Sequence, residues 1–147
     1  MNRYAKTAAA GLAVLLLIQF VPYGHDHRNP PVSGEPLWDS GATRALAKRA
    51  CFNCHSFETV WPWYAAIAPA SWLVTHDVHE GRKELNFSAW DNGRREGESP
   101  AKISKQIKQG AMPPWQYRIA HPEARLTAAE KQQLSDGLGA TLKASIK

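Results

Sequence analysis

The segment CFNCH, from Cys51 to His55, contains the only two cysteines of this 147-residue chain. Two residues separate the thiols, and a histidine directly follows the second one. So short a spacing holds both sulfur atoms on one turn and places an imidazole next to them. Whatever fold the chain adopts must therefore present three reactive side chains from a single short segment.

Several kinds of site use a Cys-x-x-Cys spacing. A thioredoxin-like redox pair needs a strand–helix–strand unit around it, and the sequence has no such pattern. A zinc site needs four ligands, so histidines such as His76 and His79 would have to complete it. A structural disulfide is possible in an exported protein, although so tight a ring seldom serves stability alone.

The fourth possibility uses the histidine as well, because Cys-x-x-Cys-His is the attachment signal for c-type haem. Two thiols on one turn can reach two vinyl groups on one edge of a porphyrin. The residue that follows then falls beneath the ring, where its imidazole can bind iron. We therefore expect one covalently attached haem c per chain, bound through Cys51 and Cys54, with His55 as an iron ligand.

The opposite side of the iron needs a second ligand, for which thioether and imidazole are the usual protein groups. Met112, in GAMPPW, is the only methionine after the initiator. Gly110 ends a helix just before it, and Pro113 biases Met112 toward an extended conformation. We predict Met112 as the sixth ligand, with packing in the core as its alternative role. The other candidates are an open position, His76, His79 and His121.

The aromatic residues between the motif and residue 90 are expected to belong mostly to the core. A flat apolar macrocycle needs large flat neighbours and few waters. Four tryptophans are therefore candidates for the lining of a haem pocket: Trp61, Trp63, Trp72 and Trp115.

Helix signals surround the motif. Asp39 or Ser40 can cap a helix that runs through Ala50 into Cys51, and Pro69 can start a second helix that continues to about Leu85. Further helices are expected from Ser99 to Gly110 and after a capping box of Thr127 and Glu130, with an apolar stripe at Leu134, Leu138, Leu142 and Ile146. The polar run 91–99 is expected to form a loop. No strand alternation is visible, so the predicted fold is an all-α domain over residues 37–147.

The amino terminus predicts a membrane anchor or a signal peptide over residues 1–23. Arg3 and Lys6 precede an apolar run from Thr7 to Val21, which is short for a bilayer span of roughly 20 residues. No small-x-small cleavage signal follows, which favours an uncleaved anchor over a removed signal peptide. The positive charges stay inside, so the rest of the chain would face the far side of the membrane.

Residues 24–36 contain three prolines and no apolar periodicity, so they are expected to form a stiff tether. At ~3.1 Å per residue, an extended tether could hold the domain roughly 40 Å from the bilayer. His25 and His27 lie in this segment, where a polar role is favoured over metal binding because no third ligand is nearby. The formal net charge is +5, but without Arg3 and Lys6 the rest of the chain carries only +3, an excess too small and scattered to suggest a nucleic-acid partner.

Taken together, CFNCHS, WPWYAAIAPASWL, LNFSAW, GAMPPW and HPEARL resemble the small bacterial haem-binding domain family of c-type cytochrome-like proteins. The resemblance covers about residues 29–138. It implies covalent haem c, export to the periplasm and a likeness to class I cytochromes c, in which a helix enters the motif and a loop brings a methionine to the opposite face. The expected fold is thus a cytochrome c-like helical domain around one haem, preceded by an N-terminal hydrophobic helix.

The function expected from this sequence is electron transfer by a single-haem cytochrome tethered to the periplasmic side of the inner membrane, with unidentified redox proteins as partners. Signal cleavage would instead leave it soluble in the periplasm. No catalytic group is required, so we expect no enzyme activity. The rival is a haem sensor or a peroxidase-like enzyme with a displaceable sixth ligand, and a third class is a structural or interaction module.

Overall fold

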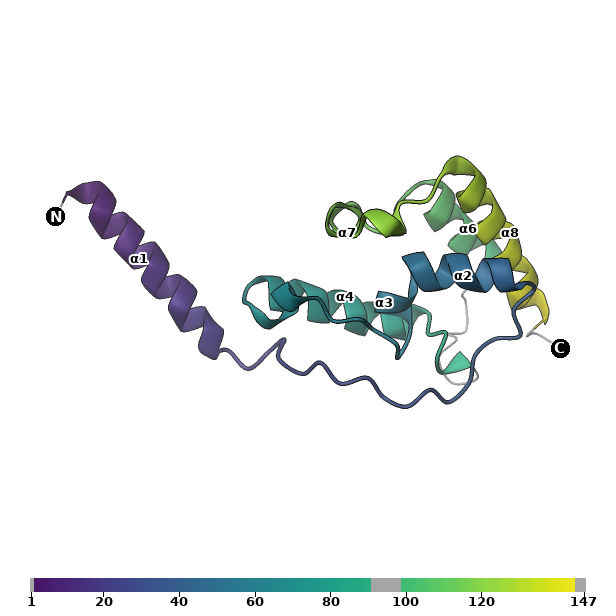
Figure 1. Cartoon of the computed structure of the whole chain (residues 1–147), viewed down its shortest axis with the longest axis horizontal. Helices are drawn as coiled ribbons and strands as arrows, with labels where there is room; N and C mark the ends of the chain where they lie inside the picture. The colour runs from purple at the N-terminus through teal and green to yellow at the C-terminus, as the bar shows by residue number, and fades with distance from the viewer. Residues whose placement is uncertain (1, 91–98, 145–147) are drawn as a thin grey trace.

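The computed structural model describes residues 2–90 and 99–144, and this part of the chain is built from helices (Figure 1). The only strand-like pairing among the described residues is one isolated bridge between Gly34 and Ala89. The all-α prediction is therefore confirmed for these residues. The elements are α1 (Arg3–Leu17), η1 (Ile18–Phe20), α2 (Gly41–Ala50), α3 (Phe52–His55), η2 (Trp63–Ala66), α4 (Ala70–Glu84), α6 (Pro100–Lys108), α7 (Trp115–Ala120), η3 (Pro122–Ala124) and α8 (Ala128–Ala144).

Helix α2 leads directly into the cysteine motif. Of the two predicted caps, Ser40 is the one used, because its side chain accepts a hydrogen bond from the Thr43 amide at 3.2 Å. The helix ends at Ala50, and Cys51 N still donates to Ala47 O at 2.8 Å. The first cysteine is therefore positioned by the last turn of a regular helix.

Helix α8 crosses α2 at close range. A Cβ atom added at Gly137 would lie 2.7 Å from Cγ2 of Thr43 and 2.9 Å from its Cβ, so only glycine allows this approach. The predicted capping box begins the helix, since Thr127 N donates to Glu130 and Glu130 N donates to Thr127. The apolar stripe of α8 is buried at Leu134, Leu138 and Leu142, while Ile146 lies outside the described residues.

The core lies between α2, α6 and α8 and extends to the segment after α4. Phe52, from the motif itself, is buried and stacks on Phe87 with ring centroids 5.4 Å apart. Phe87 in turn stacks on Trp90. The fully assembled cluster contains Leu46, Ala47, Phe52, Leu85, Phe87, Trp90, Ile107, Leu134, Leu138 and Leu142.

The two remaining predicted helices are present. Helix α4 follows Pro69 and ends at Glu84, close to the predicted limits. Helix α6 is capped by Ser99, whose side chain accepts from Lys102 N, and Gly110 lies just beyond its end with φ of 72°. Most of the predicted loop 91–99 lies outside the described residues.

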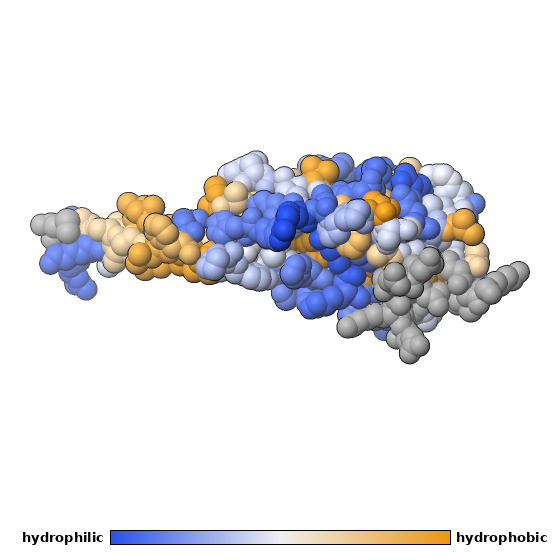
Figure 2. Space-filling view, turned by 90° about the horizontal axis from the view of Figure 1, so that it is seen from below, coloured by the Kyte–Doolittle hydropathy of each residue, from blue (hydrophilic) through white to orange (hydrophobic). Residues whose placement is uncertain are grey.

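The N-terminal segment forms α1, and most of its side chains are exposed. Figure 2 shows these hydrophobic side chains at one end of the molecule, beyond a largely hydrophilic domain surface. Within residues 2–90 and 99–144, no helix combines the length and the apolar character needed to cross a membrane. Gln19 joins this segment to the domain, because its amide donates to Ala68 O and accepts from Ala68 N, both at 3.0 Å.

Residues 24–36, expected to form an extended spacer, instead lie along the domain. His27 stacks on Trp61 with ring centroids 4.6 Å apart, and its Nε2 lies 3.0 Å from Ala65 O. Further on, Ser33 N donates to Ser88 O at 2.9 Å. We call residues 24–36 the strap, because these contacts hold them against the domain and remove the 40 Å of reach that an extended tether would have.

Candidate functional site

The cysteine motif forms one short turn of helix. His55 N donates to Cys51 O at 2.9 Å, and Cys54 N donates to the same carbonyl at 3.1 Å. Phe52 is buried in the core, whereas Cys51, Cys54 and His55 line a cavity beside the turn. The two cysteines are free thiols and form no disulfide.

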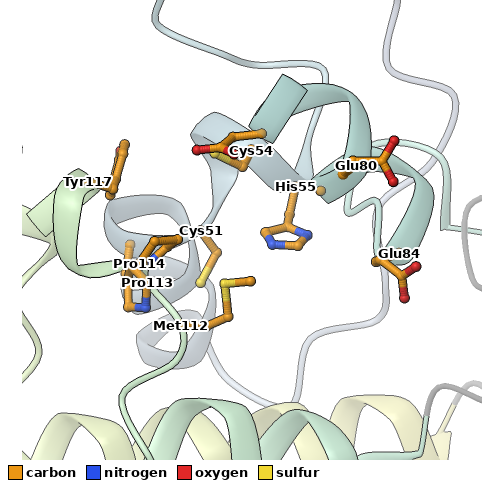
Figure 3. A pocket seen from close by; sticks show the side chains of 12 residues that line it. Cys51, Cys54, His55, Glu80, Glu84, Met112, Pro113, Pro114 and Tyr117 are labelled. Carbon is orange, nitrogen blue, oxygen red and sulfur yellow. The ribbon is translucent and has the colours of Figure 1, made fainter. Parts of the chain in front are cut away.

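Two adjoining cavities of about 180 and 170 Å³ open beside this turn. They share four lining residues, Cys51, His55, Glu84 and Met112. In Figure 3 the Cys51 sulfur, the His55 ring and the Met112 sulfur all point into the same space. The two cavities are therefore parts of one cleft, which we call the motif cleft.

The orientation of the His55 ring is set by the backbone. Its Nδ1 lies 3.0 Å from Leu85 O, and a carbonyl oxygen can only accept, so Nδ1 must donate. In the neutral ring the lone pair then belongs to Nε2, which is the atom that a metal needs. A backbone partner of this kind fixes both the tautomer and the ring plane of a metal-binding histidine.

Burial raises the pKa values of the two thiols. It raises the pKa of Cys51 to about 12, with the charge of Cys54 as a smaller cause. Burial also raises the pKa of Cys54 to about 12, and the nearby Asp77 carboxylate adds to this increase. At neutral pH both groups are therefore protonated thiols that make poor nucleophiles toward solvent reagents.

Helix α4 closes one side of the motif cleft. A Cβ at Gly81 would lie only 2.5 Å from Cys54 O, so the absence of a side chain allows the helix to pack directly on the motif. Three acids on the same face, Asp77, Glu80 and Glu84, line the cleft. Burial raises the pKa of Asp77. The i, i+3, i+4, i+7 spacing of these residues could have revealed this shared face from the sequence.

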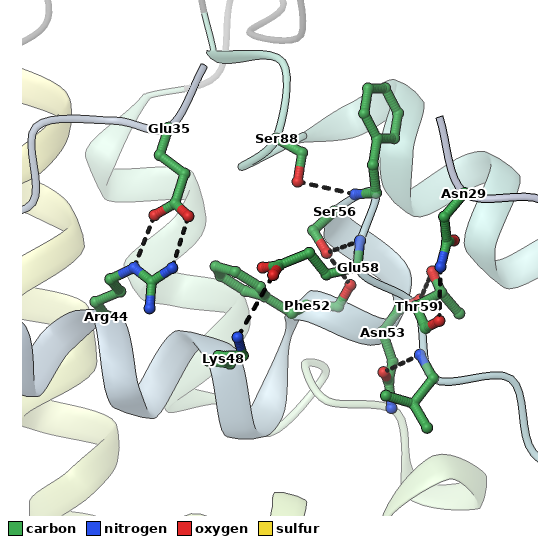
Figure 4. Close-up of polar contacts among 12 residues, drawn as sticks. Asn29, Glu35, Arg44, Lys48, Phe52, Asn53, Ser56, Glu58, Thr59 and Ser88 are labelled. Carbon is green, nitrogen blue, oxygen red and sulfur yellow. Dashed lines mark hydrogen bonds and ion pairs between the residues drawn. The ribbon is translucent and has the colours of Figure 1, made fainter. Parts of the chain in front are cut away.

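Side chains after the motif hold it in place (Figure 4). Ser56 Oγ donates to Phe52 O at 2.7 Å, and Thr59 Oγ1 donates to Asn53 O at 2.8 Å. Asn53 accepts from Val60 N and donates its amide hydrogen to the Tyr117 hydroxyl at 2.7 Å. The turn is therefore braced from both sides, by contacts that the Cys-x-x-Cys-His spacing does not reveal.

The loop after α6 brings Met112 to the motif cleft. Ala111 N and Met112 N both donate to Gln106 O, at 3.0 and 3.1 Å, so the end of α6 fixes the start of this loop. Met112 lines both cavities and is 40% exposed. Its placement differs from that of a core methionine, which would be enclosed on all sides.

The histidines that compete with Met112 lie elsewhere. His76 is exposed and lines neither cavity. His79 lines a different cavity, between α4 and the strap. His121 lies 2.9 Å from the Tyr64 hydroxyl and 3.0 Å from the Glu123 carboxylate. Among the described residues, the histidine that the structure brings to the motif cleft is His55.

The expectation that tryptophans line the pocket is wrong. The four candidates line neither part of the motif cleft, and Trp63 and Trp115 are exposed. Trp61 is instead covered by His27 of the strap. The apolar part of the lining comes instead from aliphatic, proline, phenylalanine and tyrosine side chains, because α6 and α8, rather than the segment after the motif, form the second wall of the cleft. Only Trp90 is buried in the described core, and Trp38 packs against it.

The fold and the site define an all-α domain with a Cys-x-x-Cys-His turn at a mostly apolar cleft. A family model for a haem-binding domain matches residues 13–140. The chain belongs to this haem-binding domain family, which supports haem as its cofactor. Comparisons with curated proteins and with solved structures gave no significant match.

The residues of the motif cleft fit such a group. Two unoxidised thiols and an imidazole with its lone pair on Nε2 share one wall, and a thioether reaches the same space. By contrast, no three histidine, cysteine or acidic side chains gather into a metal-binding group in the described ranges. The zinc interpretation of the motif therefore gains no support.

Proposed function

We propose that the chain is a single-haem c-type cytochrome that carries electrons. Haem would be attached through Cys51 and Cys54, with His55 on one side of the iron and Met112 on the other. The observation that carries this proposal is that Cys51, His55 and Met112 line both parts of one cleft. His55 and Met112, which are 57 positions apart in the sequence, thus line one cleft that a single haem would share.

The thiols would form the attachment. Each S–H would add across a vinyl group, so sulfur and hydrogen both end on the former double bond and no oxidant is needed. The raised pKa values of Cys51 and Cys54 keep that hydrogen on sulfur until attachment.

The two side chains that would bind the iron have separate roles. When bound, haem supplies an iron that gains and loses one electron. His55, held through Leu85 O, offers Nε2 in one fixed orientation. Met112 has no proton to gain, so its ligation would not respond to mild acid. The apolar lining of the cleft limits the water around the site, and so limits reorganisation when charge changes.

The N-terminal segment supports a membrane anchor with the domain on the periplasmic side. Arg3 and Lys6 lie in the first turns of α1, ahead of its apolar side chains, which are exposed to solvent. Haem attachment of this kind belongs outside the cytoplasm, which agrees with export. Mass measurement of membrane-extracted protein tests this point, since a mature chain beginning between residues 25 and 35 would refute the uncleaved anchor.

The decisive experiment uses protein expressed with the haem attachment machinery. We expect a low-spin visible spectrum without added ligand, and a haem that stays with the chain through acid-acetone extraction. Replacement of both Cys51 and Cys54 by alanine should release the haem in that extraction. Haem that is retained by the double variant would refute covalent attachment. High-spin iron that binds added ligands rapidly would instead favour the sensor or peroxidase-like function.

A further inference from the structure

One end of the domain exposes a group of apolar side chains. Trp63 is 79% exposed, and Ile67, Leu73 and Ile119 also contact solvent. Residues 59–75, which supply three of these four, contain no aspartate, glutamate, lysine or arginine. We call Trp63, Ile67, Leu73 and Ile119 the apolar end patch. Large apolar side chains that are exposed within so long an uncharged segment indicate contact with something other than water.

Hydrogen bonds place this patch beside the base of α1. The Gln19 side chain pairs with both backbone groups of Ala68, next to Ile67. The hydrogen bond between Tyr64 and His121 brings the end of α7, and with it Ile119, against η2. In Figure 1, α7 and the first turns of α4 lie at the end of the domain that faces α1.

Helix α1 is shorter than the hydrocarbon core of a bilayer is thick. Its 15 residues span about 22 Å at 1.5 Å per residue, less than the roughly 30 Å hydrocarbon core of a bilayer. A short apolar helix draws its flanking groups into the interface to reduce this mismatch. Phe20, the last residue of η1, is 85% exposed, and Tyr23 follows it. Tryptophan and tyrosine are the side chains that favour the headgroup region.

We propose that the apolar end patch inserts into the interfacial region of the same bilayer that holds α1. This inference rests on the proposed membrane attachment and adds a second contact to it. The domain then lies directly against the lipid in one orientation, with Gln19 as the joint between the anchor and the patch. The strap, docked along the domain, leaves no free length that would let the domain move away from the surface.

The test uses the full, haem-loaded chain in vesicles of phosphatidylcholine and phosphatidylglycerol. Single variants Trp63→Cys and Ile67→Cys carry a nitroxide spin label, and relaxation by oxygen is compared with relaxation by a water-soluble nickel complex. The matched control is Leu37→Cys, at a residue that is also apolar and 82% exposed. It lies far from α1, because the neighbouring Asp39 N donates to Thr141 near the end of α8.

We expect oxygen to relax the labels at positions 63 and 67 more strongly than nickel does, and the opposite at position 37. Labels at 63 and 67 that match the control would overturn the proposal. Labels shielded from both reagents would overturn it too, in favour of a protein partner on the patch.

Two further results separate this proposal from the proposed function. Protein that does not sediment with the vesicles would refute membrane attachment, and the patch with it. Spin-label uptake by the parent chain, which carries no introduced cysteine, would refute only the proposed thioether bonds at Cys51 and Cys54. The parent spectrum would then be subtracted, and positions 63 and 67 would still decide whether the patch contacts lipid.

Discussion

Gly137→Ala should destabilise the domain although it replaces glycine in the middle of a helix. In an unobstructed helix this substitution stabilises a protein by about 1 kcal/mol, because alanine loses less backbone entropy on folding. Here the new Cβ would lie 2.7 Å from Thr43 Cγ2 and 2.9 Å from Thr43 Cβ, and closer still to Oγ1, whereas ordinary contact begins at 3.4 Å. Thr43 is 1% exposed and cannot turn away.

Helices α2 and α8 would therefore have to separate by about 0.7 Å or more, and overpacking of this kind typically costs 1–3 kcal/mol. Near the upper end of that range, the net loss is about 2 kcal/mol after the gain in helix propensity. Urea unfolding followed by circular dichroism measures this change in the free energy of unfolding.

The control for this prediction lies two residues away in the same helix. At Gly139 the nearest atom to an added Cβ is Pro100 Cβ, at 4.0 Å, so Gly139→Ala should stabilise by about 0.5–1 kcal/mol. The two substitutions are chemically identical and should have opposite signs. If Gly137→Ala stabilises the protein as Gly139→Ala does, then α2 and α8 do not cross at this position and the described packing is wrong.

Three further predictions concern the site and the strap. Gly81→Ala should lower stability and disturb the iron ligation, because the new Cβ would lie only 2.5 Å from Cys54 O. An unchanged visible spectrum and an unchanged unfolding midpoint would count against the described packing of α4 on the motif. Met112→Ala should remove the weak ferric charge-transfer band at the red end of the spectrum and convert the iron to high spin, whereas an unaltered low-spin spectrum would exclude Met112 as a ligand. Arg44 lowers the pKa of Glu35, so this ion pair should stabilise the fold fully above about pH 5. Its contribution should be lost as the pH falls below about 4 and through the lowered pKa of Glu35. Glu35→Gln should flatten that part of the curve of stability against pH, and an unchanged curve would refute the role of the pair.

Local signals accounted for most of the helices. Ser40, the Thr127–Glu130 box and Gly110 act within one turn of the chain, so their roles follow from their own neighbours in the sequence. Ligand chemistry, rather than a helix or packing signal, predicts Met112 beside the motif, and the structure places Met112 in the lining of the motif cleft.

Other features depend on contacts between segments that are distant in the sequence. The hydrogen bond from His55 to Leu85 O links residues 30 positions apart, and no pattern in either segment predicts it. The tryptophans were misplaced for a related reason, since aromatic content indicates burial but not which surface is buried. Trp63 instead lies in solvent, where a membrane or a partner can reach it. The proline and polar composition of residues 24–36 predicts a stiff spacer, because composition indicates stiffness but not whether a segment packs against the domain.

The docked strap also sets an order of events in time. A protease needs several residues in an extended, accessible form, but here His27 is stacked on Trp61 and Ser33 N is bonded to Ser88 O. Removal of the N-terminal segment would have to happen while the domain is still unfolded, before these contacts form. Once the domain has folded, the contacts of His27 and Ser33 would oppose cleavage within the strap, and a segment that had not been removed earlier would stay attached to the domain.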